Sequence, residues 1–300
     1  MFLVVEISII IINYNTFELT CSCIDSIIKF TKDINYEIIL VDNASRECSP
    51  DLFLQKFPLI RLIKNPVNAG FTGGNNLGIQ IAKGDTILLL NSDVVLTENS
   101  VSICLDVIKN NSNIGVVSCM LKFADGIIQK QCQRFPSILL TTIELFRIHK
   151  LIPQPKRGIV MGNGFFDHLK SIYCDSVWGA FFMFPRKVLD KLEGGKLPGD
   201  FFMYAEDLMW CYSIKKMGLT IYYNADTSVI HYLGASSSET VLNLKHQNEY
   251  AFIVKYYGWL YAKILVLLRS LLYATSSSRV YAYEISGIYL KLFLKGTLLK

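Results

Sequence analysis

The sequence predicts an α/β protein with a mainly parallel central sheet and a C-terminal helical tail. Short apolar, β-branched runs alternate with segments in which apolar residues recur at helical spacing. This alternation is typical of a parallel sheet covered by helices on both faces. Each of the first four runs also ends in a polar cluster. Ligands bind at the carboxyl ends of the strands in such sheets, so the clusters indicate a candidate site.

The alternation is clearest before residue 100 and weaker after it. Strands are expected at Val4–Ile12, Glu37–Val41, Leu59–Lys64 and Thr86–Leu90, and helices at Phe17–Phe30 (capped by Thr16), at Leu52–Phe57 and over a segment ending at Ala82. Further along, we expect a helix at Val101–Lys109, strands at Ile114–Met120, Val177–Phe184, Ile221–Asn224 and Ser228–His231, and a helix ending at Met217. The stretch 121–172 is expected to be irregular, because it contains several prolines and glycines.

The charge is concentrated in the tail. The net charge is +5, yet beyond Ala251 there are seven basic residues and one acid, so residues 1–250 are about neutral. The segment Tyr256–Tyr273 is apolar and aromatic, but Lys263 and Arg269 interrupt it and count against a membrane-spanning helix. A basic helix that lies on an anionic membrane surface fits better, and an ordinary helical cap on the core is the alternative.

The eight cysteines and the N-terminal segment both indicate a cytoplasmic protein. No C-x-x-C pair is repeated at zinc spacing, so reduced, buried thiols are expected. The start, MFLVVEISIIIINYN, lacks a basic n-region and is interrupted by Glu6, so it resembles a first core strand more than a signal peptide.

The four polar clusters define one rim of the predicted sheet. They are Asn13-Tyr14-Asn15, Asp42-Asn43, Asn68–Asn76 and Asn91-Ser92-Asp93. Each cluster alone can be explained as a turn that closes a strand, but four on one rim favour a binding site. Side chains two residues apart on a strand point the same way, so Asn91 and Asp93 are expected to reach one small ligand together.

The glycines at Gly70, Gly73, Gly74 and Gly78 do not form G-x-G-x-x-G, and no G-K-[ST] follows them. The classical dinucleotide and P-loop fingerprints are therefore absent, which disfavours a Rossmann-type dehydrogenase. Glycines just before a helix either let backbone N–H groups approach a phosphate or only permit the turn.

Seven motifs in this order resemble glycosyltransferase family 2, inverting enzymes of the GT-A fold, and within it the bacterial rhamnosyltransferase-like branch. They are INYNT (12–16), VDNAS (41–45), N-x-x-N-x-G-F-x-x-G-N-N-x-G (65–78), LLNSD (89–93), WGA (178–180), FFMY-x-ED (201–207) and HY-x-G-x-S (231–236). The resemblance covers about residues 5–255. It implies a Rossmann-like nucleotide-diphospho-sugar transferase fold over 1–250, with a donor half at about 1–120 and an acceptor half at about 121–250. Residues 251–300 would form the membrane-associated tail.

The resemblance also assigns roles to residues. Asp93, in a D-x-D-type motif whose first position is Asn91, would bind a divalent cation, Mg²⁺ or Mn²⁺. His231 would be a second metal ligand, although a structural histidine is the alternative. Asp207 would be the catalytic base, with Glu206 as a supporting acceptor contact, and a first-turn helix acid is the alternative for Asp207. The nucleotide would be bound by Asn13, Tyr14, Asn15, Asp42, Asn68, Gly70, Asn75, Asn91 and Ser92. Trp178 would stack on a sugar or belong to the core.

The implied function is transfer of a sugar, L-rhamnose from dTDP-L-rhamnose, to a lipid-linked saccharide in bacterial O-antigen, capsule or cell-wall assembly. The enzyme would act at the inner face of the cell membrane. The alternatives are a UDP-hexose or UDP-galactofuranose donor, and a non-catalytic member that binds sugar nucleotides or glycans. No nucleic-acid partner is expected.

Overall fold

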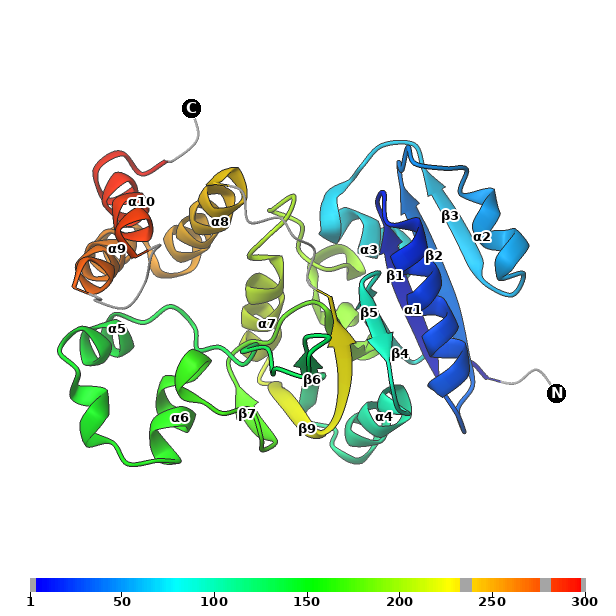
Figure 1. Ribbon diagram of the computed structural model, residues 1–300, viewed down its shortest axis with the longest axis horizontal. Coiled ribbons are helices and arrows are strands. Elements are labelled where there is room, and N and C mark those ends of the chain that lie inside the picture. Colours follow the sequence, from blue (N-terminus) through cyan, green and yellow to red (C-terminus); the bar gives the residue numbers. More distant parts are fainter. Residues whose placement is uncertain (1–3, 233–238, 276–281, 298–300) are drawn as a thin grey trace. The chain divides into compact units, whose positions relative to one another are not determined.

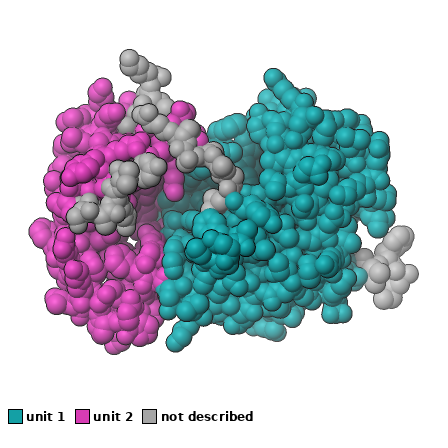
Figure 2. Space-filling model, in the orientation of Figure 1, with its two compact units in different colours: residues 1–133, 167–234 teal, residues 134–166, 235–300 magenta. Residues whose placement is uncertain are grey.

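The computed structural model describes residues 4–232, 239–275 and 282–297. It divides the chain into two compact units, 1–133 with 167–234 and 134–166 with 235–300 (Figure 2). The sequence predicted two functional regions, a catalytic domain over 1–250 and a tail over 251–300. That functional division stays a prediction.

The first unit is built around one sheet (Figure 1). Its strands are β1 (Ile7–Asn13), β2 (Tyr36–Asn43), β3 (Arg61–Asn65), β4 (Thr86–Asn91), β5 (Val94–Leu96), β6 (Ile114–Lys122), β7 (Ile172–Cys174), β8 (Phe181–Pro185) and β9 (Thr220–His231). The strand order is β3-β2-β1-β4-β8-β6-β9-β5, with β7 paired to β9. The first four strands are parallel, as predicted, whereas β8 runs antiparallel between β4 and β6.

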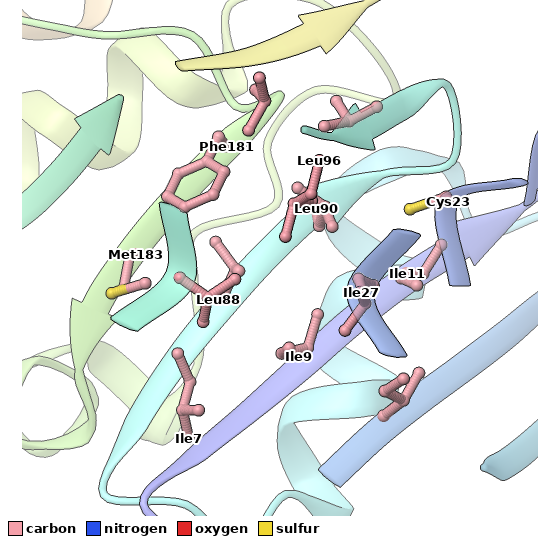
Figure 3. Packing of buried hydrophobic residues seen from close by; sticks show 14 of the residues in the cluster. Ile7, Ile9, Ile11, Cys23, Ile27, Leu88, Leu90, Leu96, Phe181 and Met183 are labelled. Atoms are coloured by element: carbon pink, nitrogen blue, oxygen red, sulfur yellow. The ribbon is translucent and has the colours of Figure 1, made fainter. Parts of the chain in front are cut away.

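The helices of the first unit are α1 (Phe17–Phe30), α2 (Asp51–Lys56), α3 (Gly70–Ile81), α4 (Ser100–Asn110) and α7 (Glu206–Lys216). Alternate residues of β1 face different helices, because strand side chains point to opposite faces. Figure 3 shows Ile7, Ile9 and Ile11 gathered with Cys23 and Ile27 of α1 in the buried core.

The other face of β1 receives α3 at two glycines. A Cβ on Gly78 would lie 2.5 Å from Cγ2 of Ile10, and one on Gly74 would lie 3.1 Å from Cδ1 of Ile12. The glycines, one helical turn apart, therefore allow α3 to lie close to the sheet. This packing holds the N-terminus of α3 at the rim where the parallel strands end.

Several expectations for the first unit differ from the structure. The glycines expected just before a helix belong to α3 itself, which begins at Gly70 and includes Gly73, Gly74 and Gly78. Thr16 makes no side-chain cap, and its hydroxyl bonds instead to Asn13 Oδ1 at 3.1 Å and Ser92 Oγ at 3.1 Å. The strand expected from Val177 begins only at Phe181, because Trp178 and Gly179 belong to the loop before it. The two short strands expected at 221–231 form the single strand β9, whose pairing with β6 shifts register between Cys119 and Met120.

The second unit is helical. It contains α5 (Ile138–Leu145), α6 (Lys156–Met161), α8 (Glu239–Tyr257), α9 (Trp259–Ala274) and α10 (Ala282–Lys295), with 3-10 turns at Ile148–Leu151 and Asn163–Phe165. The region expected to be irregular thus contributes short helices. Gly258, with φ +91°, separates α8 from α9, so the apolar segment 256–273 is not one continuous helix.

The two charges that interrupt this apolar segment are turned toward other helices of the second unit. Arg269 Nη1 lies 2.9 Å from Glu249 Oε1, and this guanidinium lowers the pKa of the buried Glu249 carboxyl to about 2. Lys263 Nζ donates to the carbonyl oxygen of Leu292 at 3.2 Å, near the C-terminus of α10. Among the described residues, no helix combines the length and apolar character that crossing a membrane requires.

Candidate active site

The Asn91-Ser92-Asp93 motif lies on a turn. β4 ends at Asn91, the chain turns at Ser92 and Asp93, and β5 begins at Val94. The strand alternation that would align Asn91 with Asp93 therefore ends at Asn91. The Asn91 Oδ1 atom is buried and has no hydrogen-bond partner among the described residues, so it can accept a hydrogen bond from a ligand.

Asp93 and His231 lie next to each other at this turn. Asp93 Oδ1 is 3.4 Å from His231 Nε2, and the His231 side chain is 5% exposed. The backbone fixes this arrangement, since Val94 pairs with His231 across β5 and β9, and the N–H of Tyr232 donates to Asp93 O at 3.0 Å. The motif that begins at His231 continues into 233–236, which lie outside the described residues.

The Asp93–His231 pair fits a divalent cation that takes its other ligands from a bound molecule. Mg²⁺ holds ligands at about 2.1 Å in octahedral geometry, so two adjacent ligand atoms lie about 3.0 Å apart. The observed 3.4 Å is close to that spacing. Over residues 4–232, 239–275 and 282–297, no cluster of three His, Cys, Asp or Glu side chains could hold a metal alone. Phosphate oxygens and water would complete the shell.

Asn13 organises the first two strand ends. Its Nδ2 donates to Asp42 Oδ1 at 2.8 Å and to Ser45 Oγ at 2.9 Å. Its Oδ1 accepts from the hydroxyls of Thr16 and Thr20. Both amide hydrogens and both lone pairs are therefore used inside the protein. This geometry favours a role in shaping the rim over direct contact with a nucleotide.

The neighbouring predicted contacts differ in what they offer a ligand. Asn15, with φ +54°, accepts from the N–H of Arg46 at 2.7 Å through its Oδ1 and so holds the next loop. Tyr14 is 48% exposed. Asp42 is buried, and the pocket beside it has a volume of about 400 Å³. The pocket is lined by Asp42, Ala44, Ser45, Arg46, Pro50, Lys64, Asn65 and Pro66.

The N-terminus of α3 is held by amide side chains. Asn43 Nδ2 donates to Asn68 Oδ1 at 2.9 Å, and Asn68 Oδ1 also accepts from the N–H of Gly70 at 2.9 Å. Asn75 is buried and donates to the carbonyl oxygen of Phe71 at 3.0 Å, within the helix. Asn68 and Asn75 thus bond to the backbone of the first turn of α3.

Gly70 connects this turn to the loop before α7. Its φ is +72°, and a Cβ there would lie 2.3 Å from the carbonyl oxygen of Phe202, which accepts from the N–H of Phe71 at 3.0 Å. Only glycine satisfies both the backbone conformation and this close approach. The loop that carries the FFMY motif therefore lies against the rim of the sheet.

Glu206 and Asp207 begin α7 with different environments. Two consecutive residues before them, Tyr204 and Ala205, have positive φ. Asp207 Oδ2 accepts from the N–H of Gly179 at 3.2 Å, and its Oδ1 accepts from the N–H of Leu208 at 2.7 Å. Glu206 is buried, and burial, reinforced by the adjacent Asp207, raises its pKa to about 8.

The predicted site residues are joined by contacts within the first unit. Thr16 links Asn13 to Ser92, and Gly179 links Phe71 of α3 to Asp207, with its ideal Cβ position 3.1 Å from Phe71 Cε1 and 3.7 Å from Asp207 Cβ. Trp178 packs against the core.

Sequence reasoning missed one residue of this site. Gln129, in the segment between β6 and the second unit, contacts both the ring and the carbonyl group of His231. The alternation Gln129, Gln131, Gln133 was a visible signal of an extended segment with polar side chains on one face. Nothing in the sequence indicated which residue they would meet.

Comparison with known proteins identifies the class and then the family. Residues 8–193 match the family described as Glycosyl transferase family 2, and this range is more than half of the chain. The chain therefore belongs to glycosyl transferase family 2, which places it among the glycosyltransferases. The expected rhamnosyltransferase-like branch is not distinguished by this match.

Curated relatives match parts of the chain. A glycosyltransferase, GlyG, of Streptococcus pneumoniae is 34% identical over 98 residues, covering 32% of each chain. A poly(ribitol-phosphate) beta-glucosyltransferase of Bacillus spizizenii is 34% identical over 134 residues, 39% of this chain and 21% of the relative. A hexosyltransferase of low-salt glycan biosynthesis, Agl10 of Haloferax volcanii, is 25% identical over 225 residues, 72% and 64% of the two chains. The matched stretches thus cover a third or less of the first two relatives.

A solved structure supports the fold. The mannosyltransferase PcManGT of Pyrobaculum calidifontis, in complex with GDP-Man and Mn²⁺, superposes with a TM-score of 0.56 and 16% identity over 98% of this chain and 76% of the other. This likeness confirms the predicted GT-A fold.

Proposed function

We propose that the chain catalyses inverting transfer of a sugar from a nucleotide-sugar donor to a lipid-linked saccharide by a single displacement. The observation that carries this proposal is the Asp93–His231 pair, with donor atoms 3.4 Å apart at the rim of the sheet. In a family 2 glycosyltransferase, such a pair suits a divalent cation bound together with a diphosphate.

The residues at the rim would divide the chemistry. Asp93 and His231 would hold the cation, which when bound offsets the negative charge that grows on the leaving diphosphate. Asn91 Oδ1, which lacks a partner among the described residues, would accept a hydrogen bond from the ribose or from a bound water. These groups would act on the leaving-group side of the reaction.

Asp207 would act on the acceptor side. Two N–H groups, from Gly179 and Leu208, fix the orientation of its carboxylate. As the acceptor oxygen bonds to the anomeric carbon and the bond to the diphosphate breaks, Asp207 would take the proton of the acceptor hydroxyl. Glu206, whose pKa is raised to about 8, would be mostly protonated at pH 7 and would contact the acceptor as a neutral group.

The donor we propose is dTDP-L-rhamnose, on the basis of the resemblance to the rhamnosyltransferase-like branch, and the alternative is a UDP-sugar. The pocket of about 400 Å³ beside Asp42 would take the nucleobase.

Isothermal titration against dTDP-, UDP- and GDP-sugars, each with Mg²⁺, Mn²⁺ or EDTA, tests the proposal. Cation-dependent binding of dTDP-rhamnose, lost in Asp93→Ala, is expected. Preference for a UDP-sugar would change the donor only. Failure of every donor to bind would favour a non-catalytic protein.

We also propose that the second unit binds the inner face of the cell membrane, where a lipid-linked acceptor is found. Residues 134–166 and 235–300 hold 13 of the 30 basic residues and only 4 of the 25 acidic ones. This unit also exposes apolar side chains on two neighbouring helices, Leu260, Ile264 and Leu271 on α9 and Tyr283, Leu290 and Leu294 on α10. Positive charge with exposed apolar residues suits an anionic lipid surface.

A further inference from the structure

Gln129 makes two hydrogen bonds to His231. The side chain of Gln129 is buried, and its Nε2 donates to the backbone carbonyl oxygen of His231 at 2.7 Å. Its Oε1 lies 2.8 Å from Nδ1 of the His231 ring. The N–H of Gln129 donates to Leu121 O at 2.9 Å, which ties this segment to β6. The glutamine is thus fixed on both its backbone and its side chain.

These two contacts determine which ring nitrogen carries the proton. A backbone carbonyl oxygen can only accept, so the amide nitrogen of Gln129 must face it. The amide oxygen must then face Nδ1, and because an oxygen of this kind also only accepts, Nδ1 must be the donor. In the neutral ring, Nε2 is left with a lone pair.

That lone pair faces a carboxylate. Nε2 lies 3.4 Å from Asp93 Oδ1, and with a neutral ring and an ionised carboxylate both atoms are acceptors. A cation between them turns this repulsion into coordination by both atoms. A hydrogen bond from the second ring nitrogen is the usual way in which proteins orient a metal-binding histidine.

We propose that Gln129 is a positioning residue that sets the Nδ1–H tautomer of His231, so that Nε2 is ready to bind a divalent cation together with Asp93. This inference rests on the proposed function, because it concerns the same cation. It adds a residue that lies outside every motif of the sequence and touches neither cation nor substrate.

The first test reads the tautomer without any metal. The chain has four histidines, so the ¹⁵N and ¹³C signals of a histidine-labelled sample can be assigned by comparison with His231→Asn. At pH about 9, where an ordinary histidine is neutral, the His231 signals should show Nδ1–H. A ring protonated on Nε2 would overturn the proposal, and this measurement needs only the wild-type fold and one assignment variant.

The second test measures Mn²⁺ binding in the presence of dTDP by the loss of the free-ion electron paramagnetic resonance signal, corrected for the Mn²⁺ that dTDP binds without protein. Gln129→Met keeps the length of the side chain but removes both hydrogen bonds, and the affinity for Mn²⁺ should fall about 10- to 100-fold. Gln131→Met is the matched control, because Gln131 is also buried and bonds to Ser118 at 3.0 Å and to the carbonyl oxygen of Cys119. The control should bind Mn²⁺ like the wild type.

The outcomes separate this inference from the function on which it rests. Equal Mn²⁺ affinity in wild type and Gln129→Met would overturn the positioning role, even if the wild type remains an active transferase. Equal losses in both variants would assign the effect to general loosening of the segment and would also overturn it. A wild type that shows Nδ1–H but binds no Mn²⁺ with dTDP or with UDP present would overturn the cation role of the site and the proposed function with it.

Discussion

Glu206 and Asp207 are adjacent carboxylic acids that the fold treats differently. The two N–H groups that bond to Asp207 stabilise a carboxylate, whereas Glu206 is buried and its Oε2 has no hydrogen-bond partner among the described residues. Burial penalises the charged form, so the pKa of Glu206 rises to about 8. A neutral acid beside a hydrogen-bonded carboxylate suits the proposed roles, in which Asp207 takes the proton of the acceptor hydroxyl and Glu206 contacts the acceptor.

Asp207→Asn tests the base. The amide keeps the shape of the side chain but cannot take a proton, so turnover should fall by about 10²–10⁴ while donor affinity stays nearly unchanged. Turnover by radiolabelled sugar transfer and donor affinity by titration provide the two readouts. Asp190→Asn, an exposed carboxylate of the same unit, is the control. Unchanged turnover in Asp207→Asn would remove Asp207 from the base role.

Glu206→Gln tests whether the Glu206 carboxyl is buried, through the pH dependence of the free energy of unfolding. The folded-state pKa of Glu206, about 8, lies above the ordinary value near 4.5. The stability that this group supports is therefore fully present below pH about 4.5 and is lost as pH rises through 8. Since one pKa unit corresponds to about 1.4 kcal/mol, the loss is on the order of several kcal/mol. Urea unfolding of the wild type from pH 5 to 9 should show this fall, and Glu206→Gln should show a much flatter profile. Parallel profiles would mean that Glu206 is solvated.

At the scale of single elements, α3 depends on its glycines. Gly78→Ala would place a Cβ 2.5 Å from Ile10 Cγ2, and overpacking of this kind costs about 1–3 kcal/mol. Helix propensity favours alanine by about 1 kcal/mol, so the net effect should be a moderate loss. Gly287→Ala on α10 is the control, since a Cβ there meets nothing within 4 Å. Thermal unfolding should show a lower midpoint for Gly78→Ala alone.

The elements also show what the sequence could predict. Phe17–Phe30 was predicted with its observed bounds, because its apolar residues recur at helical spacing and a polar turn precedes it. The parallel strands up to β4 were predicted because short apolar, β-branched runs alternate with helical segments. The antiparallel insertion of β8 was not, because an apolar run fits either direction equally well.

The candidate site was predictable where residues share a rim, and unpredictable where contacts join distant segments. Asn13, Asp42 and Asn91 lie at the carboxyl ends of the parallel strands β1, β2 and β4, where the sequence predicted them. Their individual roles needed hydrogen-bond geometry, which shows Asn13 fully used inside the protein. Gln129 was missed, because its partner His231 is 102 residues away.

At the scale of the whole molecule, charge is divided between the two units. The first unit holds 17 basic and 21 acidic residues, and the second holds 13 and 4. The inward-facing Lys263 and Arg269 do not supply the outer basic surface that the sequence suggested for the apolar segment. Exposed lysines such as Lys255, Lys291 and Lys295 remain at the surface of the unit. Membrane attachment through this unit would then combine scattered positive charge with the apolar residues of α9 and α10.

Leu260→Glu with Ile264→Glu tests this attachment. These side chains lie one helical turn apart on α9 and are 65% and 41% exposed, so glutamates should be tolerated by the fold but opposed by an anionic, apolar surface. Wild-type protein should sediment with vesicles of phosphatidylglycerol and phosphatidylcholine, less with pure phosphatidylcholine, and less at high salt. The double variant should remain in the supernatant.

The control is Leu59→Glu with Val67→Glu, which makes the same chemical change at positions 95% and 68% exposed in the first unit. If both double variants sediment like the wild type, attachment lies elsewhere. If both are released equally, added negative charge alone explains the effect, and α9 has no special contact with the membrane.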